Sequence, residues 1–272
     1  MLRRLPRRRT AVTIALSTGA GGASASRPVL WVAPSGNMVA RVTQGDERLE
    51  AGMRAQLSER EDRLDAGEEP VGWKLGLTVE DVQSRLGLEG PVVGYLTSGR
   101  LLAPGERFSL SGLERPALEP EIAVHIGRDV AAGASRDEVQ DAIDALGVAV
   151  EVIESGAPFE DLEEIVAANI FHRAVMLGPP VAERAGGWLS GVTLTVLRDG
   201  DTEEGLDVEA GGPDLHGVVW HVAGMLEAFD ERLSAGDVII AGSLTPPVPV
   251  APGNEVVVDL GPLGHLQAPF GP

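Results

Sequence analysis

The stretch that decides the fold is Ala117–Leu–Glu119–Pro–Glu121–Ile–Ala–Val–His–Ile126. Its second half, from Ile122 onward, is apolar and β-branched, which predicts a strand. Side chains two positions apart on a strand point to the same face, so Glu119 and Glu121 are expected side by side. Two buried carboxylates repel each other, and a divalent cation relieves that repulsion. The pattern therefore predicts bound Mg²⁺ or Mn²⁺, with a solvated acidic strand end as the alternative.

A third carboxylate stands in another apolar stretch, Val148–Ala–Val–Glu151–Val–Ile153, which also predicts a strand. Glu151 occupies a position where a hydrophobic residue is the default. Between the two strands, Ser135 and Glu138 have the spacing of a capping box, which predicts a helix that runs to Leu146 and has Gly147 as its C-cap.

The overall composition restricts the class of protein. The chain has 272 residues, of which 43% are hydrophobic, enough for a substantial core. A net charge of −19 argues against a nucleic-acid partner, and the absence of cysteine excludes disulfides, thiol chemistry and thiolate zinc sites. No apolar run reaches the ~20 residues that cross a bilayer. We therefore expect a cytoplasmic protein without a membrane partner.

The charge is unevenly distributed along the chain. Residues 1–37 contain six arginines and no acidic residue, whereas residues 38–272 contain 16 basic and 41 acidic residues. We interpret 1–37 as a basic N-terminal extension and 38–272 as a single catalytic domain. The extension has some features of a secretory signal; a disordered tail and a true start at Met38 are the competing interpretations.

The remaining pattern predicts more short strands than helices. Helices are expected from a start marked by Thr43, Asp46 and Glu47 to about Leu64, from Val79 or Glu80 to Leu86, and from Leu215 to Phe229. Strands are expected at four further places, namely Val71–Thr78, Val192–Leu197, Asp237–Ala241 and Glu255–Asp259. Because these elements do not alternate regularly, we predict an α+β fold with a largely antiparallel or mixed sheet. No glycine-rich nucleotide-binding motif is present.

Four stretches, taken in order, carry a family resemblance. They are Gly72–Trp–Lys74–Leu–Gly–Leu–Thr78 with the downstream V-Q-S-R-L-G, then L-E-P-E-I-A, then V-A-V-E-V-I-E-S, then Asp237 to Gly253 with its G-S-L-T-P-P. The set resembles the 2-keto-4-pentenoate hydratase and 4-oxalocrotonate decarboxylase family of the fumarylacetoacetate hydrolase superfamily. The resemblance covers most of residues 41–270.

The resemblance implies a fold, a metal and a set of site residues. The fold would be a mixed β-sheet roll of the fumarylacetoacetate hydrolase C-terminal-domain type with flanking helices. The ligands of one Mg²⁺ or Mn²⁺ would be Glu119, Glu121 and Glu151. Lys74 matches the family's lysine, and Ser243 and Thr245 match a loop near the substrate carboxylate. For the last three residues, a surface lysine and ordinary turn hydroxyls are the alternatives.

The chain departs from the family at two acidic positions. Ala168, before Asn169, and Val92, in Pro91–Val–Val–Gly94, stand where many relatives have aspartate. Both changes remove an acid that could move protons. His172 is unusual for the family; it is expected to pack in the core or lie on the surface, with a catalytic role as the alternative. His125 shares the face of the glutamates and is expected only to pack.

The resemblance implies an enzyme that acts on a small 2-oxo or 2-hydroxydienoic acid. The first hypothesis is a lyase, a hydratase that converts a 2-hydroxy-2,4-dienoate into a 4-hydroxy-2-oxo acid in aromatic compound catabolism. A decarboxylase or an acylpyruvate C–C hydrolase on the same metal platform is the alternative, as is an inactive binding or subunit homologue. A homo-oligomer is also expected.

Overall fold

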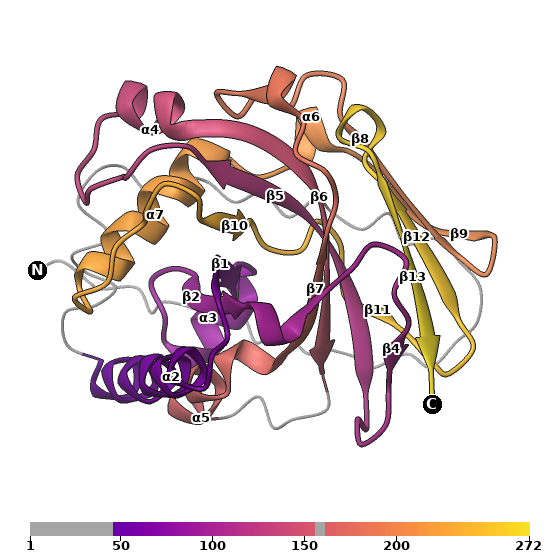
Figure 1. Ribbon diagram of the computed structural model, residues 1–272, viewed down its shortest axis with the longest axis horizontal. Coiled ribbons are helices and arrows are strands. Elements are labelled where there is room, and N and C mark those ends of the chain that lie inside the picture. Colours follow the sequence, from indigo (N-terminus) through magenta and orange to yellow (C-terminus); the bar gives the residue numbers. More distant parts are fainter. Residues whose placement is uncertain (1–45, 156–160) are drawn as a thin grey trace, which may run out of the picture.

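The computed structural model describes residues 46–155 and 161–272, so the predicted extension at 1–37 lies outside the described residues. The described chain forms two sheets and several helices (Figure 1). The larger sheet curls into a half-barrel and has the order β2-β1-β10-β5-β6-β7-β3, with β11 added beside β5. The smaller sheet has the order β4-β13-β12-β8-β9. The larger sheet mixes parallel and antiparallel pairs, which confirms the predicted α+β class.

The strands of the larger sheet are β1 (Pro70–Gly76), β2 (Val92–Thr97), β3 (Leu101–Leu102), β5 (Pro116–Ile126), β6 (Ile143–Glu154), β7 (His172–Leu177), β10 (Val238–Ile240) and β11 (Val248–Pro249). Those of the smaller sheet are β4 (Phe108–Ser109), β8 (Thr193–Arg198), β9 (Asp201–Asp207), β12 (Glu255–Asp259) and β13 (His265–Gly271). The helices are α2 (Glu47–Asp65), α3 (Glu80–Leu86), α4 (Arg136–Ala142), α5 (Leu162–Ala167), α6 (Val208–Gly211) and α7 (Leu215–Glu227).

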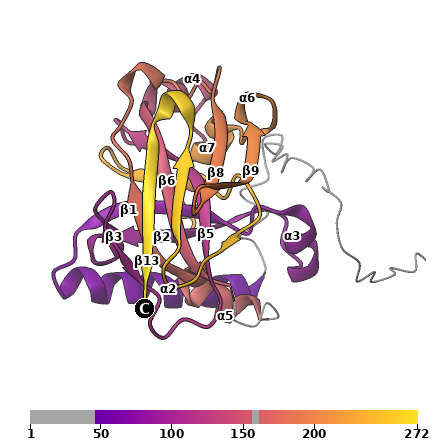
Figure 2. The ribbon, with the colours of Figure 1, turned by 90° about the vertical axis from the view of Figure 1, so that its right-hand side faces the viewer.

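The helices begin and end as their local sequence requires. Asp46 caps α2 by accepting a hydrogen bond from the backbone N–H of Arg48, and Leu49 and Met53, four residues apart, are fully buried. Helix α2 lies beside α5, and α3 stands out from the sheets (Figure 2). None of the helices in the described residues is both long and apolar enough to cross a membrane.

The predicted helix between the two acidic strands is shorter than expected. The capping box of Ser135 and Glu138 is present, but α4 ends at Ala142 and β6 begins at Ile143. Gly147 is therefore no C-cap: it pairs with Ala123 inside the β5–β6 ladder. The ladder runs along the whole of β5, and these added hydrogen bonds and buried contacts outweigh the helical tendency of residues 143–146.

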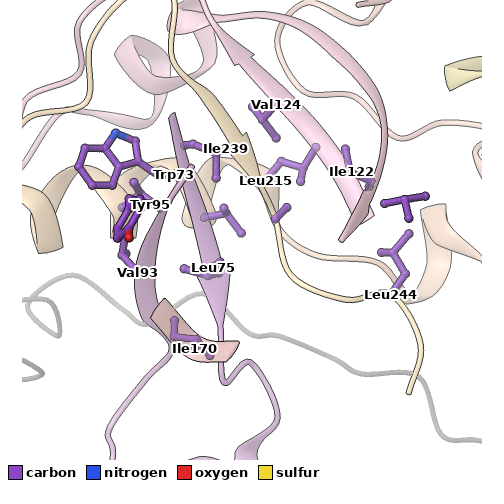
Figure 3. Packing of buried hydrophobic residues seen from close by; sticks show 14 of the residues in the cluster. Trp73, Leu75, Val93, Tyr95, Ile122, Val124, Ile170, Leu215, Ile239 and Leu244 are labelled. Carbon is purple, nitrogen blue, oxygen red and sulfur yellow. The ribbon is translucent and has the colours of Figure 1, made fainter. Parts of the chain in front are cut away.

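The two faces of the larger sheet differ in character. One face packs against α7 and the smaller sheet in a continuous apolar core, part of which Figure 3 shows around Trp73, Leu75, Ile122, Val124 and Leu215. The opposite face carries a smaller apolar cluster, which comprises Leu96, Ala123, Ala149, Val175, Val238 and Ile240. Because side chains alternate along a strand, the residues between the core positions of β1, β5 and β6 share a face with this cluster. The candidate site lies on that second face.

Candidate metal centre and active site

The antiparallel pairing of β5 with β6 brings three carboxylates together. Glu119 lies directly opposite Glu151, and Glu121 follows two residues along the same face. Each of the three offers an oxygen that lies within 4.8 Å of the other two. The exposed fraction is 0% for Glu121 and 1% for Glu151, whereas Glu119 is half-buried. The structure thus gathers the three glutamates as the sequence predicted.

The free oxygens of this triad fit a divalent cation. Glu121 Oε2 accepts a hydrogen bond of 2.8 Å from the backbone N–H of Gly242. Glu121 Oε1 and Glu151 Oε2 are buried and have no hydrogen-bond partner among the described residues. A buried carboxylate oxygen without a partner is costly, and an all-oxygen set is the kind that Mg²⁺ or Mn²⁺ prefers. The three residues could therefore hold such an ion.

The three carboxyl groups differ in their pKa. Burial, and then the charge of Glu151, raise the pKa of Glu119 to about 7. Burial and the two neighbouring carboxylates raise the pKa of Glu121 well above its ordinary value. Burial also acts to raise the pKa of Glu151, but Lys74 and His172 outweigh it, and the pKa lies below its usual range. Lys74 and His172 therefore stabilise the negative charge of Glu151, whereas no basic side chain does so to the same extent for Glu119 and Glu121.

Lys74 is buried beside the triad rather than on the surface. Its side chain is 2% exposed, and Nζ forms an ion pair with Glu151 Oε1. The lysine stem crosses Gly94 on β2, where an added Cβ would lie 2.8 Å from Lys74 Cγ. Glycine at this position therefore leaves the room that the lysine occupies.

His172 also contacts the triad, a placement that the sequence analysis did not anticipate. It begins β7, is 1% exposed, and its Nδ1 lies 2.7 Å from Glu151 Oε1. Burial lowers the pKa of its imidazole. The residue is packed, as expected, but it is also hydrogen-bonded to a candidate ligand. The only hint of this contact in the sequence was that an atypical histidine follows Asn169 by three positions.

A cavity of about 600 Å³ reaches the triad at Glu119. Lys74, Glu119, Ser243 and Thr245 line it together, so all three residues predicted to be catalytic reach the same space. The hydroxyls of the two loop residues donate to carbonyl groups nearby, Ser243 to Thr245 at 2.7 Å and Thr245 to Pro246 at 3.0 Å. The other lining residues are mostly apolar: Leu75, Leu77, Val79, Val82, Ile153, Ile170, Phe171, Pro246 and Pro247, with Gly76, Thr78 and Arg85.

Four other positions singled out in the sequence, Val92, Ala168, Asn169 and His125, lie outside the metal centre. Val92 is fully buried. Ala168 caps α5, and Asn169 binds the backbone N–H and carbonyl of Tyr95 at 3.0 and 2.9 Å. His125 shares the face of the glutamates; its Nε2 is buried, and among the described residues it has no hydrogen-bond partner.

Comparison with known proteins places this arrangement in a family. The fumarylacetoacetate (FAA) hydrolase C-terminal family matches residues 74–270. The chain is 30% identical to TodF product hydratase of Pseudomonas putida, with 90% of this chain and 91% of that protein covered. It is also 30% identical to 2-keto-4-pentenoate hydratase of Paraburkholderia xenovorans, with 76% and 78% covered.

A solved structure shows the same fold. The 4-oxalocrotonate decarboxylase of Pseudomonas putida G7, complexed with magnesium and adipate, superposes with a TM-score of 0.75 at 25% identity. The superposition covers 87% of this chain and 90% of the decarboxylase. The fold, the acidic triad and the match over residues 74–270 agree. This chain belongs to the fumarylacetoacetate hydrolase C-terminal family.

Proposed function

We propose that the protein is a hydratase that depends on a divalent metal and adds water to a 2-hydroxy-2,4-dienoate, giving a 4-hydroxy-2-oxo acid. The observation that carries the proposal is the acidic triad, which faces a largely apolar cavity beside a buried lysine. Relatives at about 30% identity that are named as hydratases of such acids support it.

Glu119, Glu121 and Glu151 would hold Mg²⁺ or Mn²⁺. Bound there, the cation would supply Lewis-acid chemistry that polarises the 2-oxo group of the substrate. Glu121 and Glu151 are buried, and the low dielectric constant around them strengthens electrostatic interactions in the site. The decarboxylase of similar structure is complexed with magnesium, which agrees with this choice of ion.

Lys74 would act on the charge that develops at the substrate's 2-oxygen. Its Nζ lies beside Glu151, and the residue lines the cavity, so the ammonium group can hold positive charge there or move a proton. Ser243 and Thr245 would orient the substrate carboxylate, because rotation of a hydroxyl exchanges its bond to a carbonyl for one to the acid. The apolar walls would hold the diene.

A decarboxylase that acts on a dicarboxylic acid is the second candidate, and Arg85 favours it. Arg85 lines the cavity from α3, together with Val79 and Val82. A guanidinium pairs well with a carboxylate, so Arg85 could receive a second acidic group at the far end of a substrate. The decarboxylase from Pseudomonas putida G7 holds adipate, which is a dicarboxylate.

One experiment separates the candidates. Purified protein is incubated with Mg²⁺ and either 2-hydroxypenta-2,4-dienoate or 4-oxalocrotonate, and products are followed by dienoate absorbance and by released CO₂. Conversion of the dienoate to a 4-hydroxy-2-oxo acid supports the hydratase. Release of CO₂ from oxalocrotonate alone supports the decarboxylase. Turnover of neither acid by protein that binds Mg²⁺ would contradict both activities and favour a binding or subunit homologue.

The assembly state is part of the same proposal. We propose a homo-oligomer, as the family resemblance implies, with no nucleic-acid or membrane partner and a cytoplasmic location. Light scattering coupled to size-exclusion chromatography tests the oligomer directly, because the mass of a 28.4 kDa monomer is easily distinguished from that of a dimer or a larger oligomer.

A further inference from the structure

We propose that His172 is a positioning residue that fixes Glu151 so that one carboxylate oxygen is kept for the metal. The inference rests on the proposed metal site. It concerns a residue that is atypical of the family resemblance and that no part of the proposed reaction uses.

The hydrogen bonds of Glu151 are divided between its two oxygens. Lys74 Nζ and His172 Nδ1 both contact Oε1, the histidine at 2.7 Å, whereas Oε2 is buried and unpartnered among the described residues. An ionised carboxylate only accepts hydrogen bonds, so Nδ1 carries the proton. Two donors on Oε1 fix the carboxylate plane and leave Oε2 as the oxygen available to a cation. Groups that orient a metal ligand in this way raise its affinity for the ion.

An unusual backbone segment delivers His172 to this position. Asn169, Ile170 and Phe171 have φ angles of 53°, 51° and 59°, which non-glycine residues rarely adopt. Strain of this kind persists only where the surroundings enforce it, and it concentrates at functional sites. Here the side chain of Asn169 binds both main-chain groups of Tyr95, which fixes the turn to β2.

The end of the turn is fixed as well. The carbonyl of His172 accepts hydrogen bonds from Arg100 and, at 3.1 Å, from Arg173. The carbonyl of Ile170 accepts one from Lys74 Nζ at 3.4 Å. The turn therefore carries His172 and contacts Lys74, the two donors to Glu151, and it holds the imidazole in one place.

His172 is placed to orient Glu151 rather than to touch substrate. Among the described residues that line the cavity, Ile170 and Phe171 are present and His172 is not. Its effect on the reaction would pass through Glu151. The appropriate readout is therefore the affinity for metal, measured without substrate.

The test compares two amides at position 172. Asparagine carries its amide nitrogen on Cγ, as histidine carries Nδ1, so His172→Asn keeps a donor near Glu151. Glutamine carries its nitrogen one bond farther away, so His172→Gln keeps polarity but moves the donor. The affinity for Mn²⁺ is measured by electron paramagnetic resonance of the free ion, and thermal unfolding of the metal-free proteins is recorded beside it. His216→Gln serves as the matched control, because His216 is also buried and binds the carbonyl of Gly186 elsewhere in the fold.

We expect His172→Gln to weaken Mn²⁺ binding about 10-fold or more, and His172→Asn to remain within about threefold of the wild type. The His216→Gln control should bind Mn²⁺ as the wild type does. Equal affinities for the wild type and both variants at position 172 would overturn the inference and leave the proposed function standing. A wild-type protein that binds no Mn²⁺ would instead refute the metal site itself, and the inference with it.

Discussion

The two faces of the larger sheet are both buried, but one stabilises the fold and the other carries the candidate site. On β5, Leu118, Ile122 and Val124 point into the apolar core, whereas Glu119 and Glu121 lie on the opposite face, where Glu119 lines the cavity. The first face gains free energy from removing apolar surface from water. The second face gathers carboxylates whose pKa burial raises, and this disfavours folding at neutral pH. The comparison teaches that one strand stabilises the fold with alternate residues and prepares a reactive site with the others.

The largest expected effect comes from the site face. Glu121→Gln removes a candidate ligand and keeps its shape, so metal-dependent turnover should fall about 10³-fold or more, equivalent to about 4 kcal/mol. The metal-free variant should be at least as stable as the wild type, because glutamine does not carry the cost of burial beside two carboxylates that raises the pKa of Glu121. Activity assays with Mg²⁺ and thermal melts without it check both parts. Full activity in this variant would refute the three-glutamate site.

The adjacent residue tests the other face. Ile122 is fully buried in the core, so Ile122→Ala should lower the free energy of unfolding by about 2–5 kcal/mol through lost burial and a cavity. Urea denaturation measures the change. Affinity for Mn²⁺ in the folded protein should remain that of the wild type. A large loss of Mn²⁺ affinity with little change in stability would mean that the two faces are not separate.

A titratable group packed with the core gives a pH test. His221 on α7 is 1% exposed, binds the carbonyl of Pro91 at 3.0 Å, and has a pKa that burial lowers to about 4. The unfolded chain has a histidine pKa of about 6.5, so between these values it binds more protons than the folded chain. The stability present above pH 6.5 is therefore lost as the pH falls, by about 2 kcal/mol between pH 7.5 and pH 5.

Denaturation at both pH values would measure that loss. The control is His221→Gln, which removes the titrating group and should lack this part of the pH dependence. The two proteins should differ in the size of the decrease, whatever the variant's absolute stability. Identical decreases would show that His221 is not held neutral.

The smallest expected effect concerns the loop beside the site. Thr245→Val removes a hydroxyl that already bonds the carbonyl of Pro246, so its loss should raise KM only a few-fold, under about 1 kcal/mol. Steady-state kinetics on the preferred acid provide the measurement. An unchanged KM would remove Thr245 from the substrate site and leave the metal site unaffected.

The sequence predicted the parts that depend on local pattern. Alternation placed Glu119 and Glu121 on one face, and the bounds of Glu255–Asp259 agree with β12. The strand containing the two glutamates extends farther back than expected, to Pro116, because it pairs with β6 along its length. Strands β9 and β13 were not predicted, since β9 is largely polar, β13 contains Pro269 and Gly271, and sheet pairing determines their structure.

For the candidate site, the sequence predicted most of the residues but not the contacts between them. The apolar pattern marked Glu151, and the family resemblance added Lys74, but nothing local showed that Lys74 pairs with Glu151 or that His172 joins them. Those contacts join residues 77 and 21 positions apart in the chain. They depend on strand order and on a left-handed turn at Asn169 to Phe171, which contains no glycine to mark it.

The pairing of Glu119 with Glu151 also determines where the chain tolerates changes in length. Their separation is set by the hydrogen-bond ladder between β5 and β6, so a single residue inserted inside either strand would turn one glutamate to the opposite side. Residues 127–142, which join the two strands, lie outside that ladder. Homologous sequences should therefore vary in length across this connection and keep a constant count within the strands themselves.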